Sequence, residues 1–171
     1  MSPHAILRHL AIAALAALAL AGCTSWKLGA PTAASVRPRS SPPPASAKVC
    51  VVRTSVLALA VTFPTRDNGL LVGATRGPSH FCYLAEPGTH QITIEADATE
   101  VATLQAEAGK SYVLSQEVDN ILGYVKCRAV WVAESEADEL FRDSSYEVLV
   151  GVPGSESLPT NPIYATAKRS F

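Results

Sequence analysis

Histidine and cysteine side chains that could bind a metal ion gather in one part of the chain, at His80, Cys82 and His90. Imidazole nitrogens and thiolates are common ligands of Zn²⁺, and a structural zinc ion takes four ligands. His80 and Cys82 are two positions apart, which places them on the same face of a strand. No fourth ligand stands at a suitable spacing, and we therefore predict no metal site.

A second group of side chains with potential for chemistry is acidic and lies further along the chain. Its members are Glu134, Glu136, Asp138, Glu139 and Asp143. A calcium site needs oxygen ligands at fixed spacing around a tight glycine turn, and this segment has no such turn. Ser135 to Asp138 instead has a capping-box pattern ahead of Leu140 and Phe141. We predict a short helix here, with a solvated acidic face.

Motifs of the common nucleophilic enzymes are missing from the sequence. Neither Gly-x-Ser-x-Gly nor Ser-x-x-Lys occurs after residue 23, and no Cys-x-x-Cys pair is present. We therefore predict no enzymatic activity and no cofactor. From Lys48 to Val152, eight Lys or Arg residues stand against fourteen Asp or Glu residues, a net charge of −6. A domain with this charge repels phosphate backbones, so nucleic acid is not an expected partner.

The N-terminal residues have the pattern of a secretion signal. Met1 to His9 is short and carries Arg8, and Leu10 to Gly22 is a continuous run of Ala, Leu and Ile that closes with Gly. The thirteen residues of this run span roughly 20 Å as a helix, which is too short for a bilayer core of about 30 Å. We predict a signal peptide over residues 1–22.

The end of that run, Leu20-Ala21-Gly22-Cys23, resembles the lipobox of bacterial lipoproteins. The resemblance implies cleavage between Gly22 and Cys23, a diacylglyceryl thioether on Cys23 and usually a third acyl chain such as palmitate. The alternative is an ordinary signal peptide with a chance cysteine. Two or three acyl chains give a stable hold on membrane lipid. Thr24, where an Asp would favour the inner membrane, favours the outer membrane, with the protein facing the periplasm or the surface.

The segment after the cysteine differs in composition from the rest of the chain. Residues 23–47 are rich in Pro, Ser and Ala, and include Pro42-Pro43-Pro44, which excludes a helix. We predict a semi-rigid tether that reaches at most about 80 Å.

Three cysteines remain after Cys23: Cys50, Cys82 and Cys127. The periplasm is oxidising, so one disulfide is expected among them. Three pairings are possible, and neither the spacing nor the hydrophobic pattern chooses between them. Cys127 is predicted to face inward, and so is Cys50 if Arg53 faces water.

From Lys48 onward, short runs of β-branched and aromatic residues alternate with turn residues, which is typical of strands. We predict an all-β fold, a small sandwich of seven or eight strands over residues 48–152, with one short helix near its C-terminal end and a flexible tail over 153–171. The predicted strands run over residues 48–54, 70–75, 80–85, 90–95, 101–106, 111–118 and 124–132, and residues 56–63 and 146–152 are candidates for a further strand.

The order DNGLLVG, SHFCYLAEPGTHQITI and AEAGKSYVL resembles a family of bacterial lipoprotein domains of unknown function. Its sandwich is similar to the PEGA and carboxypeptidase-regulatory-like domains. The matching positions are Gly69, Pro87, Gly88, His90, Gly109, Lys110 and Tyr112. These are turn and core positions, so the resemblance implies a fold and no catalytic residue. It also implies that His90 bonds backbone within its hairpin.

The sequence therefore predicts a membrane-anchored lipoprotein whose noncatalytic sandwich binds an envelope protein partner, with exposed sheet edges as the contact surface. The alternative is a module that binds peptidoglycan or another glycan. That function needs exposed aromatic residues, for which Tyr83, Tyr124 and Trp131 are the candidates. A third and weaker hypothesis is a metal-binding or cryptic enzymatic domain that uses His80, Cys82 and His90.

Overall fold

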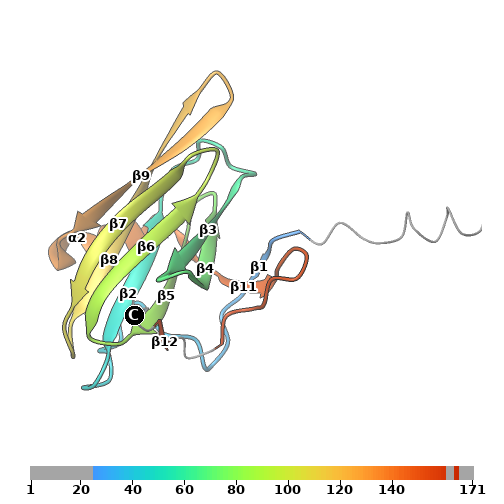
Figure 1. The fold of residues 1–171 in the computed structure, drawn as a ribbon. Helices are drawn as coiled ribbons and strands as arrows, with labels where there is room; N and C mark the ends of the chain where they lie inside the picture. Colours follow the sequence, from blue (N-terminus) through green and yellow to red (C-terminus); the bar gives the residue numbers. More distant parts are fainter. Residues whose placement is uncertain (1–24, 161–163, 166–171) are drawn as a thin grey trace, which may run out of the picture.

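The structure is a computed structural model, and it describes residues 25–160 and 164–165. Its fold is predominantly β, as the sequence predicts, with two sheets packed face to face and one short helix near the C-terminal end of the described part (Figure 1). The predicted signal peptide and the predicted lipidation site, Cys23, lie outside the described residues.

The larger sheet contains the longest strands and has β2 (Ala47–Arg53) at its centre. β2 pairs antiparallel with β5 (Ser79–Ala85) on one side and parallel with β8 (Ser111–Ile121) on the other. Two short strands add to the edge of β5, each parallel to it. The strand order is β10 (Ser145–Tyr146), β5 (Ser79–Ala85), β2 (Ala47–Arg53), β8 (Ser111–Ile121) and β9 (Tyr124–Val132), with β12 (Tyr164–Ala165) also on β5.

The smaller sheet is antiparallel throughout. Its strand order is β4 (Leu70–Arg76), β3 (Thr62–Asp67), β6 (Gly88–Glu95) and β7 (Thr99–Ala106). The β3–β4 hairpin turns at Asn68 and Gly69, as the sequence predicts, because both residues tolerate positive φ. Among the described residues, the two sheets contain six and four strands, of which eight are six residues or longer.

Apolar side chains from both sheets fill the space between them. They include Val49, Val51, Phe81, Tyr83 and Leu114 from the larger sheet and Phe63, Ile92 and Ile94 from the smaller one. Alternation along β9 follows the predicted pattern, since Val125 and Cys127 are buried in this core whereas Lys126 and Arg128 are exposed.

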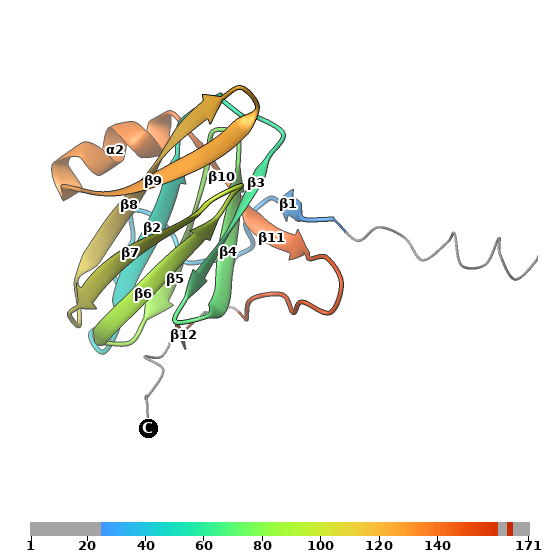
Figure 2. The same ribbon diagram turned by 45° about the horizontal axis from the view of Figure 1, so that its top comes forward.

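A second apolar layer covers the other face of the larger sheet. Cys50, Val52, Cys82 and Val113 pack there against Ala137, Leu140 and Phe141 of helix α2 (Glu134–Arg142). Every residue of β2 and β5 is therefore buried, as in a strand covered on both faces. In Figure 2, α2 lies along this outer face. The predicted capping box is wrong, since Ala133 is the N-cap and makes no side-chain cap bond, while Ser135 stands within the helix.

The predicted tether differs most from the structure. β1 (Lys27–Gly29) pairs antiparallel with β11 (Val148–Gly151). Further along, Ser35 and Ser46 are buried, and the Lys48 ammonium donates to the carbonyls of Pro38 and Ser40. An extended Pro-rich segment has no apolar periodicity, but it leaves carbonyl acceptors that donors of the domain can bind. Residues 25–46 thus lie against the sandwich, and the packing does not begin at residue 48.

The first predicted hairpin also differs. Val56–Phe63 is not a strand: residues 57–60 form a turn, and β3 begins at Thr62 and continues through Pro64. The reason is Arg53, whose side chain is completely buried. Its guanidinium donates to the carbonyls of Leu57, Ala58 and Val61, which curls this segment into a loop. Pro64 fits because only the part of β3 after it pairs with β6.

The described residues of the C-terminal part make contacts that a flexible tail would lack. The predicted strand over residues 146–152 is divided between β10, on β5, and β11, on β1. Beyond it, Glu156 forms an ion pair with Arg66 at 2.8 Å, and β12 adds to the edge of β5. Residues 161–163 and 166–171 of the predicted flexible tail lie outside the described residues.

Candidate functional site

The three residues considered for a metal site do not meet in the fold. His80 and Cys82 project from β5 toward the helix side of the larger sheet, where Phe141 contacts His80 and Cys82 joins the outer apolar cluster. His90 projects from β6 into the space between the sheets, where it bonds Asp67. Within residues 25–160 and 164–165, no group of three or more His, Cys, Asp or Glu side chains is placed to hold an ion.

His90 is instead part of a buried polar cluster. Asp67 accepts a hydrogen bond from the Tyr83 hydroxyl at 2.9 Å and contacts His90 Nδ1 at 2.8 Å. His90 Nε2 lies 2.7 Å from the Glu86 carbonyl oxygen, which confirms the predicted backbone bond. All three side chains are fully buried. No substrate can reach this cluster, so its role is to fasten β3, β5 and β6 together.

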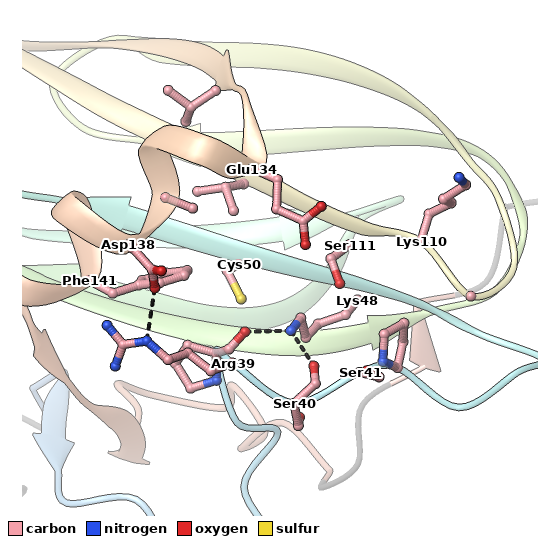
Figure 3. A pocket seen from close by; sticks show the side chains of 16 residues that line it. Arg39, Ser40, Ser41, Lys48, Cys50, Lys110, Ser111, Glu134, Asp138 and Phe141 are labelled. Atoms are coloured by element: carbon pink, nitrogen blue, oxygen red, sulfur yellow. Dashed lines mark hydrogen bonds and ion pairs between the residues drawn. The ribbon is translucent and has the colours of Figure 1, made fainter.

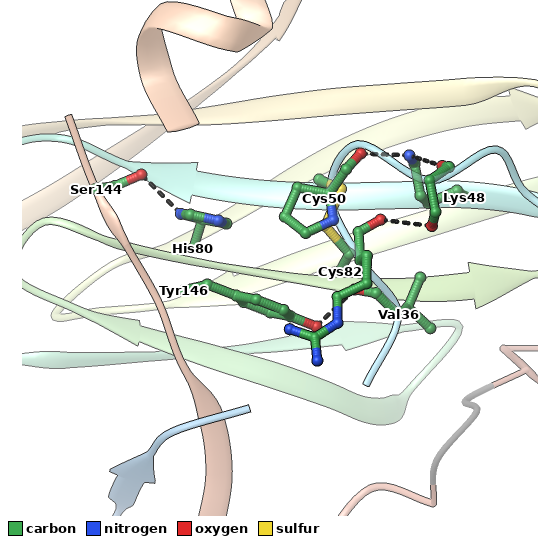
Figure 4. Close-up of a disulfide and its surroundings, with 10 residues drawn as sticks. Val36, Lys48, Cys50, His80, Cys82, Ser144 and Tyr146 are labelled. Atoms are coloured by element: carbon green, nitrogen blue, oxygen red, sulfur yellow. Dashed lines mark hydrogen bonds between the residues drawn. A yellow bond between two sulfur atoms is a disulfide. The ribbon is translucent and has the colours of Figure 1, made fainter. Parts of the chain in front are cut away.

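His80 lies in an aromatic environment on the other face of the sheet. Its ring stacks on Tyr146 with centroids 5.3 Å apart and contacts Phe141 at 5.0 Å, and Nδ1 lies 2.8 Å from the Ser144 hydroxyl (Figure 4). The Ser144 hydroxyl donates its hydrogen to the Leu140 carbonyl, so it accepts a hydrogen bond from His80 Nδ1. Burial and the nearby Arg39 charge lower the pKa of His80 to about 4. His80 is therefore neutral near pH 7 and joins α2 to β5.

The cysteine pairing that the sequence left open is resolved in the structure. Cys50 and Cys82 lie directly opposite each other on β2 and β5 and form a disulfide (Figure 4). Cys127 is a buried free thiol in the core between the sheets, and burial raises its pKa to about 12. Cys127 faces inward as predicted, whereas Cys50 faces the helix, because Arg53 occupies the inward position. A thiol with this pKa is not a nucleophile at neutral pH.

A polar cleft of about 540 Å³ lies between α2, the larger sheet and the N-terminal segment (Figure 3). Its lining includes Arg39, Lys48, Cys50, Glu134 and Asp138. Burial lowers the pKa of Lys48, while the Glu134 charge acts in the opposite direction. The ammonium donates to the backbone carbonyls of Pro38 and Ser40 and so holds the N-terminal segment against the sheet. A lysine with its hydrogens used in this way is not placed to act as a base. Arg39 bonds Asp138 at 2.8 Å across the cleft.

The clearest exposed feature is at one end of the sandwich. The strands run up and down, so the loops after β2, β4, β6 and β8 all come to the same end. Figures 1 and 2 both show the β8–β9 hairpin extending past the sandwich at the end where the β2–β3 connection lies. We define the apolar loop end as Val56, Leu57, Leu59, Ile121, Leu122 and Tyr124, which are 47% to 103% exposed. Exposed apolar side chains that gather at one end of a fold make that end a candidate interaction site.

The tip of that hairpin is conformationally unfavourable. Leu122 and Gly123 form its two-residue turn with φ of 52° and 88°. Such turns favour Asn-Gly, because a left-handed φ costs an ordinary L residue about 1–2 kcal/mol. The β3–β4 hairpin has that combination in Asn68 and Gly69. Leu122 is 103% exposed, so its side chain gains nothing from burial within the chain. Strain at an exposed apolar tip is an argument for function.

The free edge of the larger sheet is less suitable for a partner than the sequence predicted. Its last strand, β9, has side chains of the neighbouring sheet bonded to its outer amides. Asp97 accepts from the Val125 amide at 2.7 Å, and Glu100 accepts from the Ala129 amide at 3.2 Å. These acidic side chains occupy the donors that an added strand would need.

The aromatic residues proposed for glycan binding are mostly covered. Tyr83 is fully buried and bonded to Asp67. Trp131 is partly buried against the core, where its ring meets Tyr112 and its indole nitrogen donates to the Thr103 carbonyl. Tyr124 alone among the three is exposed, and it belongs to the apolar loop end.

Fold and surface together define a β-sandwich with a packed N-terminal segment and an apolar loop end. Comparison with protein-family models, curated proteins and solved structures gives no significant match to this chain. In the described part of the chain, no helix is both long and apolar enough to cross a membrane.

Proposed function

We propose that this chain is a lipid-anchored bacterial envelope protein, held by Cys23 in the outer membrane, whose noncatalytic sandwich binds a protein partner through the apolar loop end. The leader and its Leu20-Ala21-Gly22-Cys23 motif support the anchor. The observation that carries the binding function is Leu122, an apolar side chain that is fully exposed at a turn position where Asn would be more stable.

A protein is the partner that this surface fits best. Large apolar side chains with a single aromatic ring suit the buried centre of a protein interface. A glycan site would need several exposed aromatic rings, whereas Tyr83 is fully buried and Trp131 is partly buried. The role of the remaining structure is then to hold the loops rigidly, which Arg53 does for residues 57–61.

Photocrosslinking in intact cells tests this function. A benzophenone amino acid is placed at Leu122 or at Leu57, and a control carries it at Glu107, which is exposed in the β7–β8 turn at the opposite end. We expect a discrete protein adduct from both loop-end positions and none from Glu107. No adduct at Leu122, or the same adducts at all three positions, would refute partner binding through this end.

The substitution Leu122→Asn separates binding from folding. Asn relieves the left-handed strain at this turn, so the variant should be as stable as the parent or more stable by about 1 kcal/mol. We expect it to lose the adduct formed by a crosslinker at Leu57. Loss of the adduct without loss of stability assigns the effect to the missing apolar contact and not to unfolding.

A further inference from the structure

The first described strand lies very close in sequence to the proposed lipidation site. β1 begins at Lys27, so only Thr24, Ser25 and Trp26 separate it from Cys23. Four residue-to-residue steps span at most about 14 Å. A lipid on Cys23 would therefore keep Lys27 within that distance of the membrane.

This short reach applies to the whole domain, because β1 is part of it. Lys27 to Gly29 pairs with β11, and the two strands lie beside β4 of the smaller sheet. The following residues are fastened as well: the Tyr146 hydroxyl donates to the Val36 carbonyl, and Lys48 holds Pro38 and Ser40. The sandwich cannot move away from the membrane unless these contacts break.

The surface around β1 carries exposed apolar side chains. Val150, in β11, is 52% exposed and lies over Gly29, where a Cβ atom would be 3.0 Å from its Cγ1. Leu70 and Leu158 are 48% and 47% exposed and line a shared cleft of about 430 Å³. Pro159 and Thr160 line this cleft and a smaller one beside Val150. These side chains lie on the flank from which the chain leads back to Cys23.

We infer that this surface, the β1–β11 flank of Lys27, Leu70, Val150 and Leu158, lies on the outer-membrane lipid surface, an inference that rests on the lipid anchor proposed above. Exposed apolar side chains enter the head-group region, and the Lys27 ammonium lies at the level of the phosphates. The protein is then held against the membrane by its own fold, and the apolar loop end is a separate surface.

Fluorescence quenching by brominated lipids measures this contact directly. The chain contains two tryptophans, Trp26 and Trp131, and a W26F/W131F background is free of both. One tryptophan is then introduced as Leu158→Trp or Val150→Trp on the flank, or as Leu122→Trp at the loop end. Full-length lipidated variants are reconstituted into phosphatidylethanolamine and phosphatidylglycerol vesicles with and without brominated acyl chains. Urea unfolding verifies that each variant is folded.

We expect quenching several-fold stronger for Leu158→Trp and Val150→Trp than for Leu122→Trp. Quenching at Leu122→Trp alone would place the loop end in the membrane and overturn the inference, and so would the absence of quenching at all three positions. Mass spectrometry of the mature chain separates the two proposals. An unmodified Cys23 refutes the anchor and the flank contact together, whereas a lipidated protein without flank quenching refutes the flank contact alone.

Discussion

The imidazole of His90 lies between two acceptors, with Nδ1 2.8 Å from the Asp67 carboxylate and Nε2 2.7 Å from the Glu86 carbonyl. Both ring nitrogens must carry hydrogen to satisfy both partners, so the bound form is the imidazolium. Burial alone lowers the pKa of His90, but the hydrogen bonds to Asp67 and Glu86 outweigh burial and raise it. The core between the sheets thus contains an ion pair whose charge depends on pH.

Stability should fall at alkaline pH because of this pair. The folded pKa of His90 exceeds the unfolded value of about 6.5, so its contribution is complete below that pH and is lost as pH rises through the folded pKa. We expect His90→Gln to abolish this part of the pH dependence and to lower stability at about pH 6. Asp67→Asn, which leaves the histidine without its anion, should cost about 3–5 kcal/mol at that pH. Urea unfolding at about pH 6 and about pH 9 measures both effects; an unchanged alkaline decline in His90→Gln would assign it to another group.

His80 should produce the opposite effect at acidic pH. Its pKa is lowered to about 4, so the folded state binds fewer protons than the unfolded chain between that value and about 6.5. Stability is complete above about pH 6.5 and declines as pH falls, by up to about 3 kcal/mol. We expect His80→Phe, which keeps the ring between Phe141 and Tyr146, to remove this decline. A decline of equal size in the variant would show that His80 is not its source.

The thiols of the mature domain should react in two classes. In denaturant without reductant, an alkylating reagent should modify Cys127 alone, and after reduction it should modify Cys50, Cys82 and Cys127. In the native protein, Cys127 should react slowly, because it is buried and its pKa is raised to about 12. Mass spectrometry counts the adducts, and modification of Cys50 before reduction would contradict the pairing. The double variant Cys50→Ala and Cys82→Ala should lose about 4 kcal/mol, given a sequence separation of 32.

Arg53 should be essential for the order of the loop that it fastens. Arg53→Met removes donors to three loop carbonyls and the guanidinium that lies 4.3 Å from the Phe63 ring centre. We expect a loss of about 2–4 kcal/mol and faster amide exchange over residues 57–61. Arg76→Met is the matched control, since that arginine is exposed, and it should change stability by less than about 0.5 kcal/mol. Equal effects of the two substitutions would refute the special role of Arg53.

Much of the fold can be predicted from local sequence patterns. Alternation along Tyr124–Val132 predicted which side chains enter the core, and Asn68-Gly69 predicted the β3–β4 hairpin. These features depend on neighbours within one strand or one turn, so the period of two and the φ preferences of Asn and Gly determine them.

Features that depend on distant parts of the chain were predicted less well. β2 is covered on both faces, so its sequence AKVCVVR carries no clear alternation, and the inward position of Arg53 follows only from the packing. The cysteine pair requires the register of β2 against β5, which a single sequence does not reveal. The packing of residues 25–46 depends on backbone carbonyls, which side-chain patterns do not report.

The apolar loop end has one signal in the sequence, which the prediction of binding through sheet edges overlooked. Between the predicted strands over residues 111–118 and 124–132, Leu122-Gly123 has Leu where Asn is usual in a two-residue turn. An apolar residue at such a position is detectable without a structure. Its grouping with Val56, Leu57 and Leu59 is not, because that depends on the up-and-down course of the strands.

The central place of β2 in the larger sheet governs the order of folding. As the chain emerges with its N-terminus first, β2 has two unpaired edges until β5 supplies one partner and β8 the other. The parallel β2–β8 pair closes a long loop, which makes it a slow step. During that interval a largely apolar strand is open to association with other chains.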